Sequence, residues 1–322
     1  MKQFATIIIM LLLLPALMLS GCKETVTKGK KSIVCTIFPQ YDWVRQILGD
    51  KAGDMELTLL LNNRVDLHSY QPSVNDIVKM SASDLFIYVG GESDGWVKDA
   101  LKKAANPDMI VINLLDALGG AAKTEEIREG MEAEESGRED ENEAEYDEHV
   151  WLSLKNARIL IAVIADALSK LDAGDAGEYK NNLSRYDEKL KSLDAEYKSA
   201  VAAASVKTLL FGDRFPFRYL VDDYGLDYHA AFPGCSAETE ASFETIVFLA
   251  KKVDELGLKT VMVTESSDKS IARTIISNTK AKNQRILVLD SMQSATAGDV
   301  QNGTTYLSVM ENNLNVLKDA LK

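Results

Sequence analysis

Two histidines and an aspartate are the side chains of this sequence whose types and positions could together bind a metal ion. His68 follows the apolar run Leu57–Leu61, and His149 precedes a long helical pattern. Asp290 ends the apolar run Ile286–Leu289. The carboxyl ends of parallel strands carry the ligand sites of α/β proteins. Neutral imidazoles and an ionised carboxylate are suitable ligands for Zn²⁺ or Mn²⁺.

Signatures of enzyme chemistry are missing from the sequence. It contains no phosphate-binding loop, no Gly-x-Ser-x-Gly elbow and no His-Glu-x-x-His motif. The sequence therefore favours a binding protein over an enzyme.

Eight short apolar runs alternate with helical patterns, which is typical of buried parallel strands in α/β layers. The first set is Ser32–Phe38, Leu57–Leu61, Leu85–Gly90 and Ile110–Leu115, and the second is Lys207–Gly212, Leu226–Phe232, Thr260–Ser266 and Arg285–Ser291. We predict an α/β fold with two lobes, each with a four-stranded, mostly parallel sheet flanked by helices.

A long helical region, 152–205, separates the two sets. Apolar and tyrosine side chains recur in it at spacings of three and four, which predicts one buried helix face. The residues are Tyr179, Leu183, Tyr186, Leu190, Leu193, Tyr197 and Val201. At 1.5 Å per residue, a helix from Glu178 to Ala204 would be roughly 40 Å long. We expect it to be a rigid connection between the lobes.

Length and charge restrict the class of protein. The chain has 322 residues, enough for two domains of ~150 residues. With 49 acidic and 36 basic residues the formal net charge is −13, which argues against a nucleic-acid partner. The segment Ala121–Glu148 contains 13 acidic and 3 basic residues. We expect a solvated loop there, either a weak collector of cations or a solubilising insertion.

The N-terminus has the pattern of a secretory signal. Lys2 precedes the apolar stretch Phe4–Leu19, which is too short to span a bilayer comfortably. Leu19-Ser20-Gly21-Cys22 resembles the lipobox of bacterial lipoproteins. The resemblance implies a signal peptide at 1–21, a diacylglyceryl group on the Cys22 sulfur and a tether at 22–31. The mature protein would be extracytoplasmic, anchored at the outer face of the cytoplasmic membrane.

Two further cysteines, Cys35 and Cys235, lie far apart in the sequence. They could form one disulfide or remain two buried thiols, and the sequence does not decide between these alternatives.

The mature chain resembles the metal-binding lipoproteins of bacterial ABC importers for zinc and manganese, the ZnuA, AdcA and PsaA type. The resemblance is carried by Phe38-Pro39, His68-Ser69-Tyr70-Gln71-Pro72-Ser73, Asp84-Leu85-Phe86, His149-Val150-Trp151-Leu152-Ser153, Tyr224-Gly225-Leu226, Thr264-Glu265 and Val288-Leu289-Asp290-Ser291. It implies a cluster A-I type solute-binding protein, in which two lobes at 32–151 and 206–322 bind metal in the cleft between them. It also implies a monomer that delivers its metal to an ABC permease with its ATPase.

The resemblance transfers ligand roles to particular residues. His68 and His149 match the two ligands of the N-terminal lobe, and Asp290 matches the carboxylate ligand of the C-terminal lobe. Counting back from Tyr-Gly-Leu places Arg214 at the remaining position, where the family has His or Glu. A guanidinium group cannot bind a cation. This position is a departure from the family pattern.

Three alternatives could repair this departure. Asp213 could be the missing ligand, or His229 could reach into the site instead. In the third alternative the metal keeps a water, and Arg214 pairs with Asp290 or Asp213. We expect Arg214 and Glu265 to contact the metal ligands without binding the metal themselves. A set of two histidines and two carboxylates is compatible with both Zn²⁺ and Mn²⁺. We favour zinc because such ligands generally bind zinc more tightly than manganese.

The sequence thus predicts an extracytoplasmic lipoprotein that captures a divalent transition metal for import. Two other hypotheses remain. The same fold could bind an anionic or small-molecule ligand through Arg214, or the chain could be a secreted metalloenzyme.

Overall fold

The computed structural model describes residues 29–132, 145–236 and 240–322. The chain divides into two units, 1–30 and 31–322. Of the first unit only Gly29 and Lys30 are described, and they belong to no helix or strand. The predicted signal peptide, Cys22 and most of the predicted tether lie outside the described residues.

The first sheet has four parallel strands in the order β2-β1-β3-β4. In the central strand, Ile33 pairs with Leu57 on one side and with Leu85 on the other. Ile33 and Leu85 have no exposed surface, as expected for strands covered on both faces. The strands are β1 (Lys31–Cys35), β2 (Met55–Leu59), β3 (Leu85–Tyr88) and β4 (Ile110–Asn113).

The second sheet repeats this plan, again all parallel, in the order β6-β5-β7-β8. Its strands are β5 (Thr208–Phe215), β6 (Asp227–Pro233), β7 (Thr260–Thr264) and β8 (Arg285–Leu289). The pairing of β5 with β6 has an irregularity between Phe211 and Arg214, after which Arg214 pairs with Phe232. Arg214 therefore lies in a strand and not in the loop that the predicted end at Gly212 implied.

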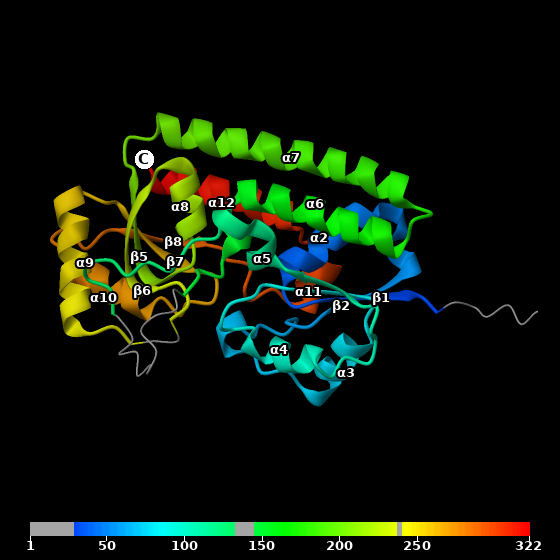
Figure 1. Cartoon of the computed structure of the whole chain (residues 1–322). Helices are drawn as coiled ribbons and strands as arrows, with labels where there is room; N and C mark the ends of the chain where they lie inside the picture. Colours follow the sequence, from blue (N-terminus) through cyan, green and yellow to red (C-terminus); the bar gives the residue numbers. More distant parts are fainter. Residues whose placement is uncertain (1–28, 133–144, 237–239) are drawn as a thin grey trace, which may run out of the picture. The chain divides into compact units, whose positions relative to one another are not determined.

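Helices cover both faces of each sheet (Figure 1). In the N-terminal lobe, α3 and α4 lie on the side away from α7, and α2 lies with α6 on the other side. In the C-terminal lobe, α8 and α12 lie toward α7, and α9 and α10 lie on the far side. The bounds are α2 (Phe38–Leu48), α3 (Val74–Ala82), α4 (Gly95–Leu101), α5 (Leu114–Leu118), α8 (Arg218–Tyr224), α9 (Phe243–Leu256), α10 (Ser270–Asn278), α11 (Ala297–Gln301) and α12 (Tyr306–Ala320). Short 3-10 turns are Gly49–Asp54, Leu67–Ser69, Gly119–Ala121 and Val150–Leu152.

Two helices, α6 (Leu154–Leu171) and α7 (Ala176–Ala203), form the connecting region. The 28 residues of α7 make it about 42 Å long. Near one end Asn182 Nδ2 donates to Ile47 O of α2, and near the other Tyr197 Oη donates to Met310 O of α12. One helix thus packs against both lobes, as the sequence predicted.

The apolar runs correctly predicted the eight strands found in the described residues, with ends that differ by a few residues. The predicted face of α7 is buried except for Leu183, which is partly buried. The fold class expected from the sequence is confirmed.

The acidic segment Ala121–Glu148 differs from the solvated loop that we expected. Its described parts, 121–132 and 145–148, contact the C-terminal lobe. Tyr219 Oη accepts a hydrogen bond from Lys123 N–H at 2.9 Å, and Glu132 N–H donates to Ala231 O at 2.9 Å. Charged side chains of the segment add ion pairs with the same lobe, such as that of Lys123 with Asp222. Charge composition does not reveal these contacts. Residues 133–144 lie outside the described residues.

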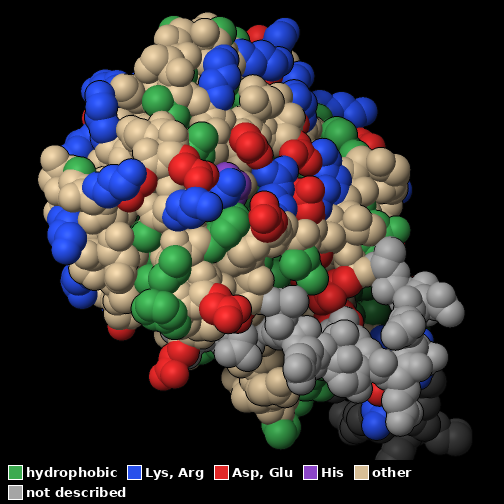
Figure 2. Space-filling model, turned by 90° about the vertical axis from the view of Figure 1, so that its left-hand side faces the viewer, with side chains coloured by type: hydrophobic (Ala, Val, Ile, Leu, Met, Phe, Trp, Pro, Cys, Tyr) green, Lys and Arg blue, Asp and Glu red, His purple; other side chains and the backbone are tan. Residues whose placement is uncertain are grey.

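Charge on the described surface is mixed. On the face in Figure 2, turned toward the reader from the left side of Figure 1, Lys and Arg side chains alternate with Asp and Glu. None of the helices in the described ranges combines the length and the apolar character needed to cross a bilayer.

Candidate metal centre

His68 lies in the turn that follows β2. Asp66 caps this turn, because its Oδ1 accepts the His68 N–H at 3.0 Å. The Nδ1 atom of the His68 ring is 2.8 Å from Ser93 Oγ, in the loop after β3, and 3.7 Å from Glu148 Oε2. With Nδ1 held in this way, Nε2 is directed to the opposite side of the ring.

His149 lies just before α6 and has no exposed surface. Asp147 Oδ1 accepts two hydrogen bonds from this residue, one from the backbone N–H at 2.9 Å and one from ring Nδ1 at 3.0 Å. Metal-binding histidines usually have such a carboxylate on the ring nitrogen that does not bind the metal. The helix that follows is fixed by Ser153, whose Oγ accepts the Asn156 N–H at 3.0 Å.

The two rings meet through their free nitrogens. The Nε2 atoms of His68 and His149 are 3.1 Å apart, and the ring centroids are 5.1 Å apart. Two imidazoles bound to one tetrahedral zinc ion at 2.0–2.1 Å would have their nitrogens about 3.3 Å apart. The pair is therefore already close to the separation that a shared ion requires.

The surroundings of the rings set their pKa values in opposite directions. Burial lowers the pKa of His68, and the adjacent His149 lowers it further. Burial also acts to lower the pKa of His149, but the carboxylates of Asp147, Glu148 and Asp66 outweigh it and raise that pKa. Of the two rings, the surroundings therefore favour protonation of His149 over protonation of His68.

Carboxylates around the pair favour a cation. Burial raises the pKa of Glu148 to about 7, and its Oε2 is buried without a hydrogen-bond partner. Glu148 and Asp147 are each about 97% buried or more. A negative charge is costly in a buried site unless a positive charge lies nearby. The carboxylates of Glu148 and Asp147 would therefore stabilise a divalent ion bound at the Nε2 atoms.

Arg214, at the position where the resemblance implied a ligand, is held by other contacts. Its Nη2 is 2.6 Å from Asp66 Oδ2, and its Nη1 donates to Ser236 O at 3.3 Å. The guanidinium group pairs with Asp66 rather than with the Asp213 or Asp290 that we considered. The Asp66 carboxylate therefore compensates the charge of this guanidinium group, beside the two histidines.

Asp213 and His229, the two alternatives for the missing ligand, have other surroundings. Both oxygens of Asp213 accept hydrogen bonds, Oδ2 from Thr264 N–H and Oγ1–H at 2.9 and 2.7 Å and Oδ1 from Arg214 N–H at 2.8 Å. His229 is in β6 and packs against the Phe248 ring, with centroids 5.9 Å apart. Neither belongs to the group of ligand atoms around His68 and His149 among the described residues.

Asp290 follows β8 and lies beside the same interlobe region. Burial and the nearby Glu265 raise its pKa to about 7, and its Oδ1 accepts the Met292 N–H at 2.7 Å. The structure does not bring its oxygens into the close group around the histidines. Glu265 instead fixes the next loop, because its carboxylate accepts the N–H groups of Ser291 and Ser294 at 2.8 and 3.2 Å.

Cys235, which sequence reasoning did not place at the site, joins the two histidines. Its Sγ and one ring nitrogen each of His68 and His149 all lie within 4.8 Å of one another. It follows β6 by two residues, so the rule that pointed to His68, a ligand-type residue after an apolar strand, could have found it. Cys35 and Cys235 are both free thiols, and Cys35 is buried in β1.

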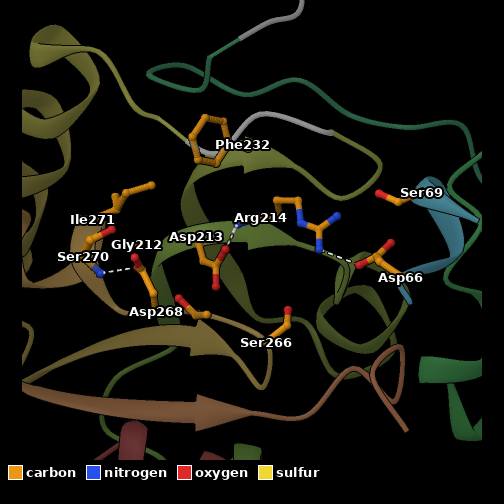
Figure 3. Close-up of a pocket in the computed structure, with 11 residues that line it drawn as sticks. Asp66, Ser69, Gly212, Asp213, Arg214, Phe232, Ser266, Asp268, Ser270 and Ile271 are labelled. Atoms are coloured by element: carbon orange, nitrogen blue, oxygen red, sulfur yellow. Dashed lines mark hydrogen bonds and ion pairs between the residues drawn. The ribbon is translucent and has the colours of Figure 1, made fainter. Parts of the chain in front are cut away.

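A pocket of about 340 Å³ lies beside this group, with walls from both lobes. Asp66 and Ser69, on either side of His68 in sequence, form one wall, and Asp213 and Ser266 belong to the other (Figure 3). The ion pair between Arg214 and Asp66 crosses from one wall to the other.

Comparisons with known proteins agree with this geometry. Residues 33–320 match a family model described as zinc-uptake complex component A, periplasmic. This family is one of uptake components and not of enzymes. The zinc-binding lipoprotein AdcA of Streptococcus pneumoniae strain R6 is 31% identical over 309 residues, which is 94% of this chain. This chain spans only 58% of the length of that relative.

A relative of similar length is the high-affinity zinc uptake system protein ZnuA of Bacillus subtilis. It is 29% identical over 315 residues, or 95% of this chain and 94% of the relative. Among solved structures, the Zn(II)-bound ZnuA-like domain of S. pneumoniae AdcA is 29% identical. It covers 91% of this chain and 99% of its own, with a TM-score of 0.70.

Proposed function

Because this chain belongs to the family of periplasmic zinc-uptake components, we propose that it captures zinc outside the cytoplasm for an ABC importer. It binds one Zn²⁺ ion between its lobes and passes the ion to an ABC permease with its ATPase. Manganese is the alternative metal. The zinc-binding names of the relatives support the choice of zinc.

One observation carries the proposal, namely the 3.1 Å separation of two buried Nε2 atoms whose rings are both held at Nδ1. In our proposal His68 and His149 bind the ion through these atoms. Asp290, next to Ser291, is proposed as a carboxylate ligand from the C-terminal lobe. Ser291 O accepts the Trp151 Nε1–H at 2.8 Å, which ties this loop to the segment of His149.

Capture and release need no covalent chemistry. Zinc binding displaces the protons carried by the two Nε2 atoms, because both Nε2 lone pairs must be free to bind the ion. Asp147 keeps the His149 ring in place during the exchange. The carboxylates of Asp147 and Glu148 favour the charge of the ion.

The geometry gives no support to an anion site at Arg214. Its guanidinium group already pairs with Asp66, and the buried carboxyl groups of Glu148 and Asp147, which lie beside the two histidine rings, would repel an anion there. A cation therefore fits the site better than the anionic ligand considered from the sequence.

Attachment to the membrane is a further part of the proposal. The lipobox pattern ending at Cys22 supports a lipid anchor at the outer face of the cytoplasmic membrane. We propose that the anchored protein acts as a monomer. Replacement of Cys22 by Ala would then release the protein from the membrane fraction, which fractionation of cells measures.

The test is equilibrium dialysis against zinc with elemental analysis of the purified protein. We expect one tightly bound equivalent in the wild type and a loss of at least about 100-fold in affinity for His68→Ala and for His149→Ala. His229→Ala is the matched control, because it removes a histidine that lies away from the group. If both site variants bind zinc and manganese as the wild type does, the proposal is wrong.

A further inference from the structure

Cys235 lies next to the two histidines, although the family resemblance gave it no role as a ligand. Its Sγ and the ring nitrogens form a group within 4.8 Å, drawn from three distant parts of the chain. The sulfur belongs to the C-terminal lobe and the imidazoles to the N-terminal side. A ligand at this place would bridge the two lobes.

The backbone on both sides of Cys235 is held by side chains from elsewhere in the fold. Glu125 Oε1 accepts the Cys235 N–H at 2.8 Å. Arg214 Nη1 donates to the O atom of the next residue, Ser236, at 3.3 Å. Arg214, which cannot bind a cation, thus fixes the segment that presents the thiol.

Gly234 allows this segment to approach the His149 ring. A Cβ atom at Gly234 would lie 3.1 Å from His149 Cε1 and 2.9 Å from the backbone O of Phe215. Both distances are too short for an ordinary carbon contact. Glycine therefore permits the close packing that brings the next residue, Cys235, to the two histidines.

Resting on the proposed function, we propose that Cys235 is a protein ligand of the zinc ion, together with His68 and His149. It takes the role that Arg214 cannot fill. The thiol loses its proton to solvent when the sulfur binds, so that Cys–SH and Zn²⁺ become a Zn–S bond and a released H⁺. The fourth position stays available for Asp290 or a water molecule.

The geometry suits this role after a small adjustment. With Zn–S near 2.3 Å and Zn–N near 2.0–2.1 Å, tetrahedral angles put the sulfur about 3.5 Å from each nitrogen. The present limit of 4.8 Å exceeds that value by about 1.3 Å. A movement of this size is within reach of a side-chain rotation or a slight approach of the lobes.

A thiolate ligand has a consequence for metal choice. Soft sulfur ligands favour zinc, whereas manganese is bound best by oxygen ligands. Cys235 would therefore make this site selective for zinc over manganese, which two histidines and carboxylates alone do not achieve. The substrate class of the site becomes zinc or another thiophilic ion.

X-ray absorption spectroscopy at the zinc edge tests the proposal directly. The proteins compared are the wild type, Cys235→Ser and the matched control Cys35→Ala, all in a Cys22→Ala background that removes the remaining thiol. We expect one sulfur at ~2.3 Å in the wild type and in the control, and only nitrogen and oxygen ligands in Cys235→Ser. We also expect Cys235→Ser to bind zinc at least about tenfold more weakly and to lose much of the preference over manganese.

The outcomes separate this proposal from the one on which it rests. A wild type that binds one zinc with nitrogen and oxygen ligands alone overturns the role of Cys235 and leaves zinc capture intact. A wild type that binds no zinc overturns both. If Cys235→Ser fails to fold, alkylation of the wild type with iodoacetamide decides the question. Zinc must then protect Cys235 from modification, and equal modification with and without zinc overturns the proposal.

Discussion

Asp147 provides a test of how the protein tunes its metal site without touching the metal. Its Oδ1 accepts both the backbone N–H and the ring Nδ1 of His149, at 2.9 and 3.0 Å, in a region with almost no solvent exposure. Asp147→Asn keeps an oxygen for these hydrogen bonds and removes the negative charge. Its backbone contacts, O with Tyr219 Oη at 2.9 Å and N with Lys123 O at 2.9 Å, remain available.

The expected loss of zinc affinity follows from the charge. Partners of this kind typically contribute 10- to 100-fold to metal affinity, so Asp147→Asn should weaken zinc binding by about 1.4–2.7 kcal/mol at pH 8. The carboxylate makes the His149 ring more basic, and a more basic nitrogen binds zinc more strongly once its proton is gone.

The pH dependence has a definite sign. Because Asp147 helps to raise the pKa of His149, protons compete with zinc in the wild type as the pH falls through that raised pKa. The variant loses this effect, and its His149 stays unprotonated to a lower pH. The difference in affinity between the two proteins should therefore be largest at pH 8 and smaller at pH 6.

Competition titration with a zinc chelator at both pH values measures these affinities. Asp108→Asn is the matched control, because it makes the same charge change at an exposed position. Equal affinity of Asp147→Asn and Asp108→Asn at pH 8 would refute the reasoning. A difference that grows on acidification would refute the assigned direction of the His149 pKa.

Two further predictions concern stability. Tyr306 Oη donates to Trp151 O at 2.7 Å in a fully buried position, so Tyr306→Phe should lower the free energy of unfolding by about 1–3 kcal/mol with zinc stoichiometry unchanged. Urea titration measures this loss, and an unchanged midpoint contradicts it. Burial raises the pKa of Asp94 from 3.8 to about 6, so its contribution to stability is present at low pH and lost as the pH rises through 6. Relative to Asp94→Asn, the wild type should lose up to about 3 kcal/mol between pH 4 and pH 7, and parallel stability curves for the two proteins would contradict this.

Local pattern was sufficient for most of the fold. Each strand is a short apolar run because both faces of a parallel sheet are covered, and this requirement is visible in the sequence of each strand separately. The buried face of α7 follows from a spacing of three and four for the same reason. Strand ends were less predictable, and β5 continues through Arg214 because β6 pairs with it up to Pro233.

The candidate site was only partly predictable. The sequence indicates His68 and His149 because histidine is rare in this chain and because both residues lie at the ends of elements. Cys235 obeys the same rule after β6, but the sequence offered a disulfide or a buried thiol as equally simple roles. Glu125 lies in a segment whose composition suggested a solvated loop, so its contact with Cys235 N–H was not expected.

The amino-acid sequence by itself determined the two sheets, the helix that joins them and the presence of two imidazoles near strand and helix ends. Only the tertiary structure decided which polar groups meet. Asp213 accepts a hydrogen bond from Thr264, and Arg214 forms an ion pair with Asp66. Cys235 is the residue that lies beside the two histidines. Helix and strand formation depends on neighbours a few residues apart. The contacts of Asp213 and Arg214 join residues 51 and 148 positions apart, and chain packing alone brings them together.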